Sequence, residues 1–187
     1  MDFTTIHLRK SYEKIQQLKM MKKISTLTFV FCAVLMFAQS SNKNLNRDLK
    51  SMRDAAINKE YEKMVELIYP KSFDIIGGKA NAPMMLRMMD AKAGEEGVKL
   101  VSITHKNLGK LVKTQSELQL PLDQITILKA KDGKNISTNL TLIAISNDKG
   151  KNWKFINTFN QPKDRLYTMF PNLSKELQIP EKKMEVK

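Results

Sequence analysis

The feature that most constrains the fold of this chain is a change of residue pattern at Gly97. Before it, apolar residues recur at helical spacing, as in the series Leu45, Leu49, Met52 and Ala56. After it, segments rich in β-branched and aromatic residues alternate with turn residues, which is the pattern of antiparallel strands. Helices gathered in one half and strands in the other predict an α+β domain.

The helical half is interrupted by loop-forming residues. From Leu45 onward the spacing predicts two consecutive helices or one kinked helix, with Asn58 at the interruption, where it can cap the second. The paired glycines of "DIIGGK" predict a loop. A further helix follows, with Asn81 as its cap and Gly94 or Gly97 as its stop.

The half after Gly97 divides into short segments. Candidate strands are "VKLVSITH", "GKLVKTQSELQL", "LDQITILKA", "ISTNLTLIAISN" and "NWKFINTF". The Asp-Gly pair in "KDGK" predicts a type I′ hairpin, and the segment "NLTLIAIS", apolar on both faces, predicts a central strand. Two short helices separated by Pro171 are expected in "DRLYTMFPNLSKELQIP". We therefore expect N-terminal helices packed on an antiparallel meander sheet, with short C-terminal helices.

Residues 20–38 have the order of a secretory signal peptide. Two lysines precede an uncharged, mostly apolar run of 15 residues, from Ile24 to the small Ala38. A membrane-spanning helix needs about 20 apolar residues, so we predict export to the periplasm or the outside, with cleavage after about Ala38. An uncleaved membrane anchor and a buried core helix are the alternatives. Phe31 before Cys32 argues against a lipoprotein, which needs a small residue there.

Cleavage defines the remaining segments. Residues 1–19 are interpreted as an upstream extension from a misassigned start codon, with a long basic n-region as the alternative. The mature chain would consist of a disordered N-terminus over 39–44, one α+β domain over 45–180 and a basic tail over 181–187. It would lose Cys32, the single cysteine. Disulfides, a thiolate nucleophile and cysteine metal sites are then excluded.

The positive charge of the chain is spread along the sequence. The formal net charge is +13, of which residues 1–38 carry +4, so +9 would remain after cleavage. Lysines in "HKNLGKLVK", "LKAKDGK" and "KNWK" stand among polar residues, and arginine is sparse, so we expect a solvated surface and no nucleic-acid partner. Weak contact with anionic cell-envelope surfaces stays open, because charge alone cannot establish it.

The stretch "SNDKGKNW" resembles the Asp box of sialidase propeller blades. The resemblance implies that Asp148 bonds backbone in a tight hairpin, that Gly150 takes a positive φ and that Trp153 packs under the turn. A propeller needs at least four blades of roughly 40 to 50 residues, which one copy of the motif cannot supply. We expect a structural hairpin without sialidase chemistry.

The order of elements resembles the nuclear transport factor 2-like superfamily, a cystatin-like α+β cone. The runs "YEKMVELIYP", "IIGGK" and "FPNLSKELQIP" are also similar to those of small secreted proteins of Gram-negative bacteria. The resemblance implies a cone-like, curved sheet with a pocket between sheet and helices. Proteins of this fold include isomerases, dehydratases and binding modules, so the fold names no function. Sheet pairing into a homodimer, common in that superfamily, is also left open.

Candidate site residues follow from that implied pocket. Enzymes of this fold that move protons combine a carboxylate base with a Tyr, His or protonated acid. The mature chain offers one histidine, His105, with Tyr61, Tyr69 and Asp74 as companions, and no paired carboxylates. Residues proposed to line the pocket or bind a ligand are Tyr61, Tyr69, Phe73, Met85, Met89, His105 and Trp153.

Four methionines in "PMMLRMMD" raise the question of a metal. Met84 and Met88 lie one helical turn apart, as do Met85 and Met89, and thioethers suit Cu(I). The same spacing forms an apolar helical face that packs in a core, lines a pocket or meets a partner, so we expect no metal and no cofactor. The sequence favours an exported, non-enzymatic module that binds a small apolar ligand or a protein, without stable membrane insertion after cleavage. An isomerase-like or hydratase-like enzyme is the alternative.

Overall fold

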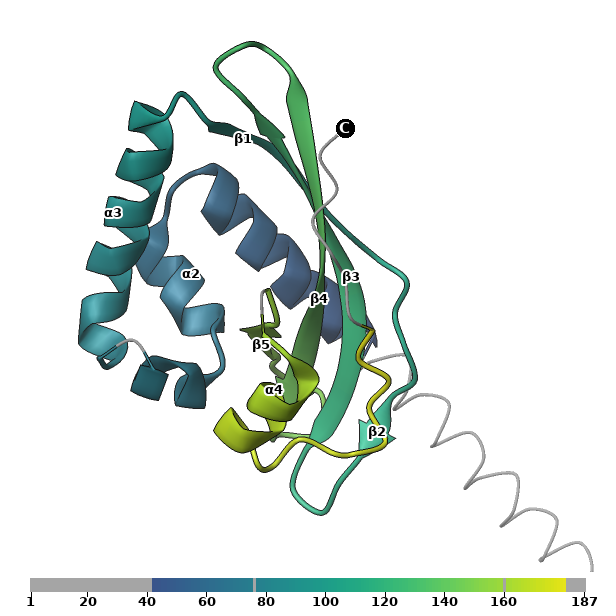
Figure 1. The fold of residues 1–187 in the computed structure, drawn as a ribbon. Helices are drawn as coiled ribbons and strands as arrows, with labels where there is room; N and C mark the ends of the chain where they lie inside the picture. Colours follow the sequence, from purple (N-terminus) through teal and green to yellow (C-terminus); the bar gives the residue numbers. More distant parts are fainter. Residues whose placement is uncertain (1–41, 76, 160, 181–187) are drawn as a thin grey trace, which may run out of the picture. The chain divides into compact units, whose positions relative to one another are not determined.

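The computed structural model describes residues 42–75, 77–159 and 161–180 (Figure 1). The expected upstream extension, signal peptide and basic tail lie outside the described residues. Within them the α+β prediction is confirmed, because helices accompany a five-stranded antiparallel sheet. No helix among the described residues is long and apolar enough to span a membrane.

The N-terminal part is helical. Its elements are a helix over residues 42–57, α2 (Tyr61–Leu67), the 3-10 turns η1 (Pro70–Ile75) and η2 (Lys79–Asn81), and α3 (Ala82–Glu95). Residues 42–44, expected in a disordered N-terminus, are therefore helical. The first helix buries Leu45 and Leu49 as its spacing predicts, but it buries Ala55 in place of Ala56.

The two asparagines expected to cap helices do not cap them. Asn58 lies in a turn with Lys59, whose φ is 59°, and α2 starts after Glu60 without a side-chain cap. The side-chain amide of Asn81 donates to the carbonyl of Gly77, and its oxygen accepts no hydrogen bond from the first N–H groups of α3. The turn makes 42–57 and α2 two separate helices rather than one kinked helix.

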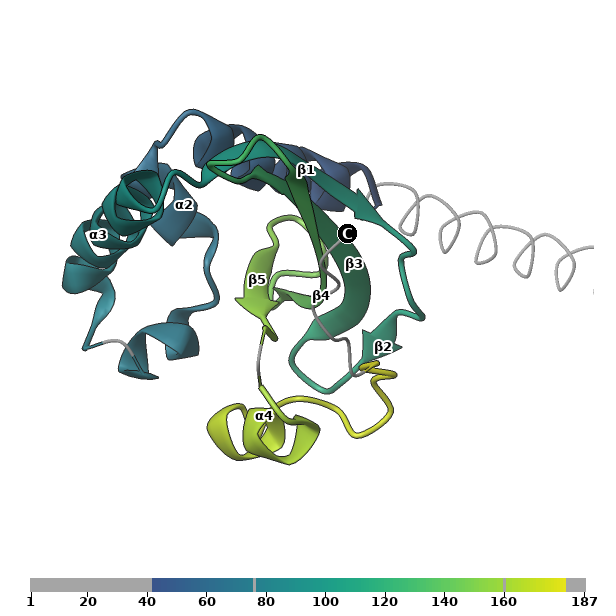
Figure 2. The same cartoon turned by 45° about the horizontal axis from the view of Figure 1, so that its top comes forward.

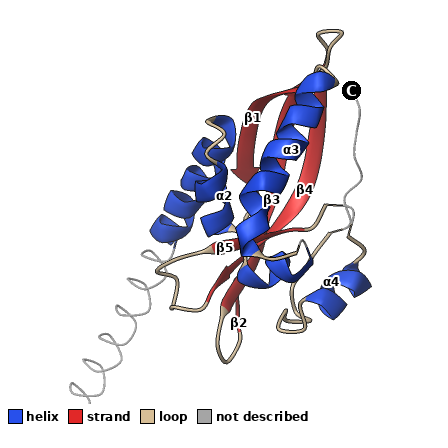
Figure 3. Ribbon diagram, turned by 90° about the vertical axis from the view of Figure 1, so that its left-hand side faces the viewer, coloured by secondary structure: helices blue, strands red, loops and turns tan. Residues whose placement is uncertain are grey.

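The strands follow one another as a meander (Figure 3). They are β1 (Lys99–Lys106), β2 (Val112–Lys113), β3 (Leu118–Lys129), β4 (Asn135–Ser146) and β5 (Lys154–Asn157). The order is β1-β3-β4-β5, and β2 also pairs with β3. Since β4 occupies one side of β3, β1 and β2 share the other side.

Two sequence expectations about the strands need correction. Pro121 does not separate two strands but lies inside β3, because its carbonyl accepts a hydrogen bond from Gly109 and its missing N–H faces that irregular edge rather than β4. The β3–β4 hairpin is not type I′, since Asp132 does not have a positive φ. Gly133, with φ 84°, closes a type I turn with a bulge.

Each face of the sheet carries a hydrophobic core, and helix 42–57 and α4 lie on different sides of the sheet (Figure 2). On one face, Leu45 and Leu49 of helix 42–57 pack on a cluster formed by Leu118, Leu120, Leu122, Leu140, Leu142, Ala144, Trp153 and Phe155. On the other, α4 (Lys163–Met169) and the following segment pack on Ile143, Ile145 and Ile156. Residues 171–180 contain turns and irregular chain but no helix, so the second expected C-terminal helix is absent.

Candidate functional site

The sheet face that helix 42–57 covers changes from apolar to polar along its length. Leu120 and Leu122 of β3 are buried on this face, and the two-residue period places Gln124 and Thr126 on it as well. His105 of β1 lies opposite Gln124 in the register. All three polar side chains are half-buried. We call His105, Gln124 and Thr126 the polar row.

Hydrogen bonds fix the polar row from end to end. The amide nitrogen of Gln124 lies 3.3 Å from Thr126 Oγ1, to which it donates. Its Oε1 therefore faces His105 Nε2, 3.1 Å away. Because an amide oxygen only accepts, Nε2 carries the proton, and the neutral imidazole presents Nδ1 as an acceptor.

The environment of His105 keeps its imidazole neutral at a lower pH than that of an ordinary histidine. Burial lowers the pKa of His105, the hydrogen bond with Gln124 opposes this, and the positive charge of Arg53 lowers the pKa further. Arg53 belongs to helix 42–57, and its Nε and Nη2 donate to Asp54 Oδ1 over 3.1 and 3.0 Å. Helix 42–57 thus brings the positive charge of Arg53 toward the polar row, and Asp54, the next residue, holds the guanidinium in place.

A second polar cluster lies where the C-terminal segment meets the sheet. Tyr69 donates to Glu117 Oε1 over 3.0 Å, while Asn172 and Gln119 each donate to Glu117 Oε2 over 2.8 Å. Burial, together with the charge and hydrogen bond of Glu117, raises the pKa of Tyr69 to about 12, although a hydrogen bond from Asn172 opposes this. Gln119, fully buried, also accepts from the backbone N–H of Ser174. This cluster fastens the segment to the sheet.

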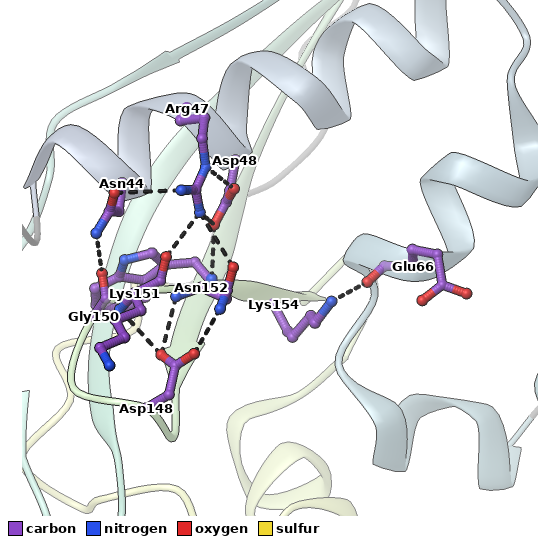
Figure 4. A network of polar contacts seen from close by, with 10 residues as sticks. Asn44, Arg47, Asp48, Glu66, Asp148, Gly150, Lys151, Asn152 and Lys154 are labelled. Carbon is purple, nitrogen blue, oxygen red and sulfur yellow. Dashed lines mark hydrogen bonds and ion pairs between the residues drawn. The ribbon is translucent and has the colours of Figure 1, made fainter.

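The Asp-box-like hairpin is held by the carboxylate of Asp148 (Figure 4). Its Oδ1 accepts from the backbone N–H groups of Lys151 and Asn152, each over 3.0 Å, and from the hydroxyl of Ser146 over 2.8 Å. Burial alone would raise the pKa of Asp148, but the hydrogen bonds from Asn152, Ser146 and Lys151 outweigh it and lower the pKa to about 2. Gly150 has φ 82°, as this turn requires.

Helix 42–57 grips the same hairpin. Arg47 donates to the carbonyl of Lys151 over 2.8 Å, and Asn44 donates to that of Gly150 over 2.9 Å (Figure 4). Asp48 accepts from the backbone N–H of Trp153 over 2.8 Å, and Trp153 is 1% exposed in the core beneath. The hairpin contacts shown here are structural.

The candidate residues from the sequence lie in separate clusters. Tyr61 donates to Asp90 and lies under the guanidinium of Arg87. Phe73 is buried in a satellite core with Val65 and Ala82. Met85 is half-buried and Met89 is 66% exposed. Trp153 lies in the main core, Tyr69 in the Glu117 cluster and His105 in the polar row.

Sequence reasoning missed the partners of these residues. Gln124 and Thr126 continue the two-residue spacing of Leu120 and Leu122 in "LPLDQIT". Polar residues at the core-facing positions of a strand were therefore a signal for the row. Arg53 and Asn172 carried no such signal, because their positions depend on how helix 42–57 and the C-terminal segment pack.

The methionines of α3 differ in exposure. Met84 and Met88 of α3 are 56% and 64% exposed. Within the described residues there is also no group of three His, Cys, Asp or Glu side chains that could hold a metal ion.

No protein-family model matches this chain, and no curated protein matches it.

Proposed function

We propose that this protein is an exported, non-enzymatic binding module whose ligand lies against the polar row. One observation carries the proposal: three half-buried polar side chains, joined in a chain by hydrogen bonds through Gln124, continue a sheet face whose other end is a hydrophobic core, and Thr138 of β4 lies opposite Thr126 on the same face. Small-molecule sites typically combine an apolar lining with a few polar groups that orient the ligand. The hydrogen bonds within the row do not involve His105 Nδ1, which is therefore an acceptor that a ligand could use.

The surroundings of the row favour a ligand with an apolar body. Ile103 of β1, Leu128 of β3 and Ile136 of β4 lie on the same face by register and are half-buried. A small ligand with one hydrogen-bond donor would satisfy His105 and cover these side chains. The alternative within this proposal is that a protein partner, rather than a small ligand, binds against the polar row.

The finer fold and the export of the chain are part of this proposal. Helices over one face of an antiparallel meander support a cone-like arrangement of the nuclear transport factor 2-like kind. The lysines and apolar run before Ala38 support a leader that is removed at export.

An isomerase-like or hydratase-like enzyme is the second candidate, and one contact favours it. Tyr69 and Glu117 form a tyrosine–carboxylate pair with a 3.0 Å hydrogen bond. However, Glu117 Oε2 is also hydrogen-bonded to Gln119 and Asn172, so both of its oxygens already have partners. That saturation suits a structural clamp better than a base that must accept a substrate proton.

Native mass spectrometry of the protein exported under its own leader tests the proposal. We expect a chain starting near Gln39 that retains a small non-covalent mass. The double variant H105L/Q124L, similar in side-chain size, should lose that mass, whereas T104V, at an exposed position on the opposite face of β1, should keep it. A mass that persists in the double variant contradicts the site, and retention of residues 20–38 contradicts cleavage.

A further inference from the structure

One edge of the sheet is formed by an irregular piece of chain between β1 and β2. Lys106 pairs with Asp123, the N–H of Gly109 donates to the carbonyl of Pro121 over 2.8 Å, and β2 then resumes regular pairing with β3. Residues 106–113 thus run along β3 at the edge opposite β4 (Figure 1). We call residues 106–113 the edge loop.

The edge loop exposes apolar and cationic side chains together. Leu108 and Leu111 are 46% and 45% exposed. Lys106, Lys110 and Lys113 are exposed as well, and the loop contains no acidic residue. Among the described residues, no ion pair engages any of these three lysines.

The backbone of the edge loop is anchored at three points. Asn107, with φ 51°, donates to Asp123 Oδ2 over 2.8 Å. A Cβ at Gly109 would lie 2.8 Å from Pro121 Cγ, so the backbone sits directly against β3. Val112 is buried in the core on the sheet face that helix 42–57 does not cover. The loop therefore presents its leucines and lysines from a fixed backbone, and presenting them costs little conformational entropy.

This combination distinguishes the edge loop from the exposed methionines of α3. Met84 and Met88 are more exposed than the leucines, yet α3 also carries Asp90 and Glu95. Leucines among unpaired lysines suit a lipid surface, because the apolar groups enter the headgroup region while the cations meet anionic headgroups. A nucleic-acid surface would instead need stacking aromatics or arginines, and the loop has neither.

We propose that the edge loop is a peripheral docking site for an anionic phospholipid bilayer. Leu108 and Leu111 enter the interface, and Lys106, Lys110 and Lys113 contact the headgroups. The site is independent of the polar row, and it places the module on a membrane surface without a membrane-spanning segment.

The test is co-sedimentation of the exported, processed protein with vesicles. Binding is expected to vesicles that mix phosphatidylglycerol with phosphatidylcholine, to be weak on phosphatidylcholine alone, and to fall with salt. Because each lysine near such a surface contributes about fivefold in affinity, K110Q/K113Q should bind on the order of 25-fold more weakly. L108S/L111S should lose about tenfold, whereas the control M84S/M88S should bind as the parent does.

Three outcomes would overturn the proposal. The first is equal binding to both vesicle types, and the second is full binding by L108S/L111S. The third is that K110Q/K113Q loses affinity for single-stranded DNA as much as for vesicles, which would indicate a general polyanion-binding surface. Leu108→Cys carrying an environment-sensitive fluorophore gives a second readout, since the processed chain is expected to have no other cysteine: its emission must shift to the blue on anionic vesicles. H105L/Q124L should bind vesicles normally, which separates this inference from the proposed ligand site.

Discussion

At the scale of single residues, burial and hydrogen bonding shift pKa values in opposite directions, and the balance between them differs from site to site. Asp148 is partly buried, yet backbone and side-chain donors keep it ionised with a pKa of about 2. His105 has one hydrogen bond, to Gln124, and burial prevails, so its pKa falls. Several hydrogen bonds outweigh burial at Asp148, whereas burial and the charge of Arg53 outweigh a single hydrogen bond at His105.

Replacing Asp148 with Asn should destabilise the protein in a pH-dependent way. The folded pKa lies below the ordinary 3.8, so the carboxylate stabilises the fold above about pH 4 and loses that contribution as the pH falls toward 2. Allowing for solvent screening, D148N should lower the free energy of unfolding by about 1 to 2 kcal/mol at pH 7.

Urea unfolding at pH 7 and at pH 2.5 measures this difference. The gap between parent and D148N should narrow at the lower pH. Asp74→Asn, at an exposed carboxylate, serves as the control and should show a much smaller gap. A gap for D148N that is the same at both pH values would contradict the assigned role.

His105 should make the fold less stable as the solution is acidified below its ordinary pKa. The folded pKa lies below 6.5, so the unfolded chain binds the proton first and stability decreases as the pH falls through 6.5 toward the folded pKa. In H105Q this decrease should be absent. Melting temperatures measured between pH 7 and pH 5 check it, and NMR titration of the ring protons should give a pKa under 6.5 directly. A pKa at or above 6.5 would sink the prediction.

At the scale of elements, the C-terminal segment depends on tertiary contacts rather than on its own secondary structure. Residues 171–180 contain turns and irregular chain, and Leu173, Leu177 and Ile179 are buried on the sheet face opposite helix 42–57. Asn172 adds polar attachment through Glu117. The expected second helix after Pro171 is absent, and the leucines of this segment are buried in the core from turns and irregular chain.

Truncating Leu177 should detach part of this segment. It is 2% exposed, and removing a buried leucine side chain costs about 2 to 4 kcal/mol through lost contacts and the cavity left behind. The fluorescence of Trp153, the only tryptophan, reports urea unfolding of L177A. Gln178→Ala, at an exposed neighbour, should change stability by less than about 0.5 kcal/mol. A loss below about 1 kcal/mol for L177A would show that the segment is not part of the core.

At the scale of the whole described unit, one sheet joins two cores. Helix 42–57 covers one face and reaches the β4–β5 hairpin through Arg47 and Asp48, while α4 and the C-terminal segment cover the other. β4 contributes to both cores, with Leu142 on one face and Ile143 on the other. Its sequence, apolar on both faces, predicted this central place correctly, because alternate side chains of a strand point to opposite sides.

The sequence by itself determined the α+β class, most of the helices and strands, and the position of the Asp148 hairpin. Those features depend on period, turn residues and contacts only a few residues apart, all of which are written locally in the chain. Only the tertiary structure decided that Gln124 meets His105, that Asn172 meets Glu117, and that the edge loop lies against Pro121. These contacts depend on strand register and on the docking of distant segments, which no local pattern specifies.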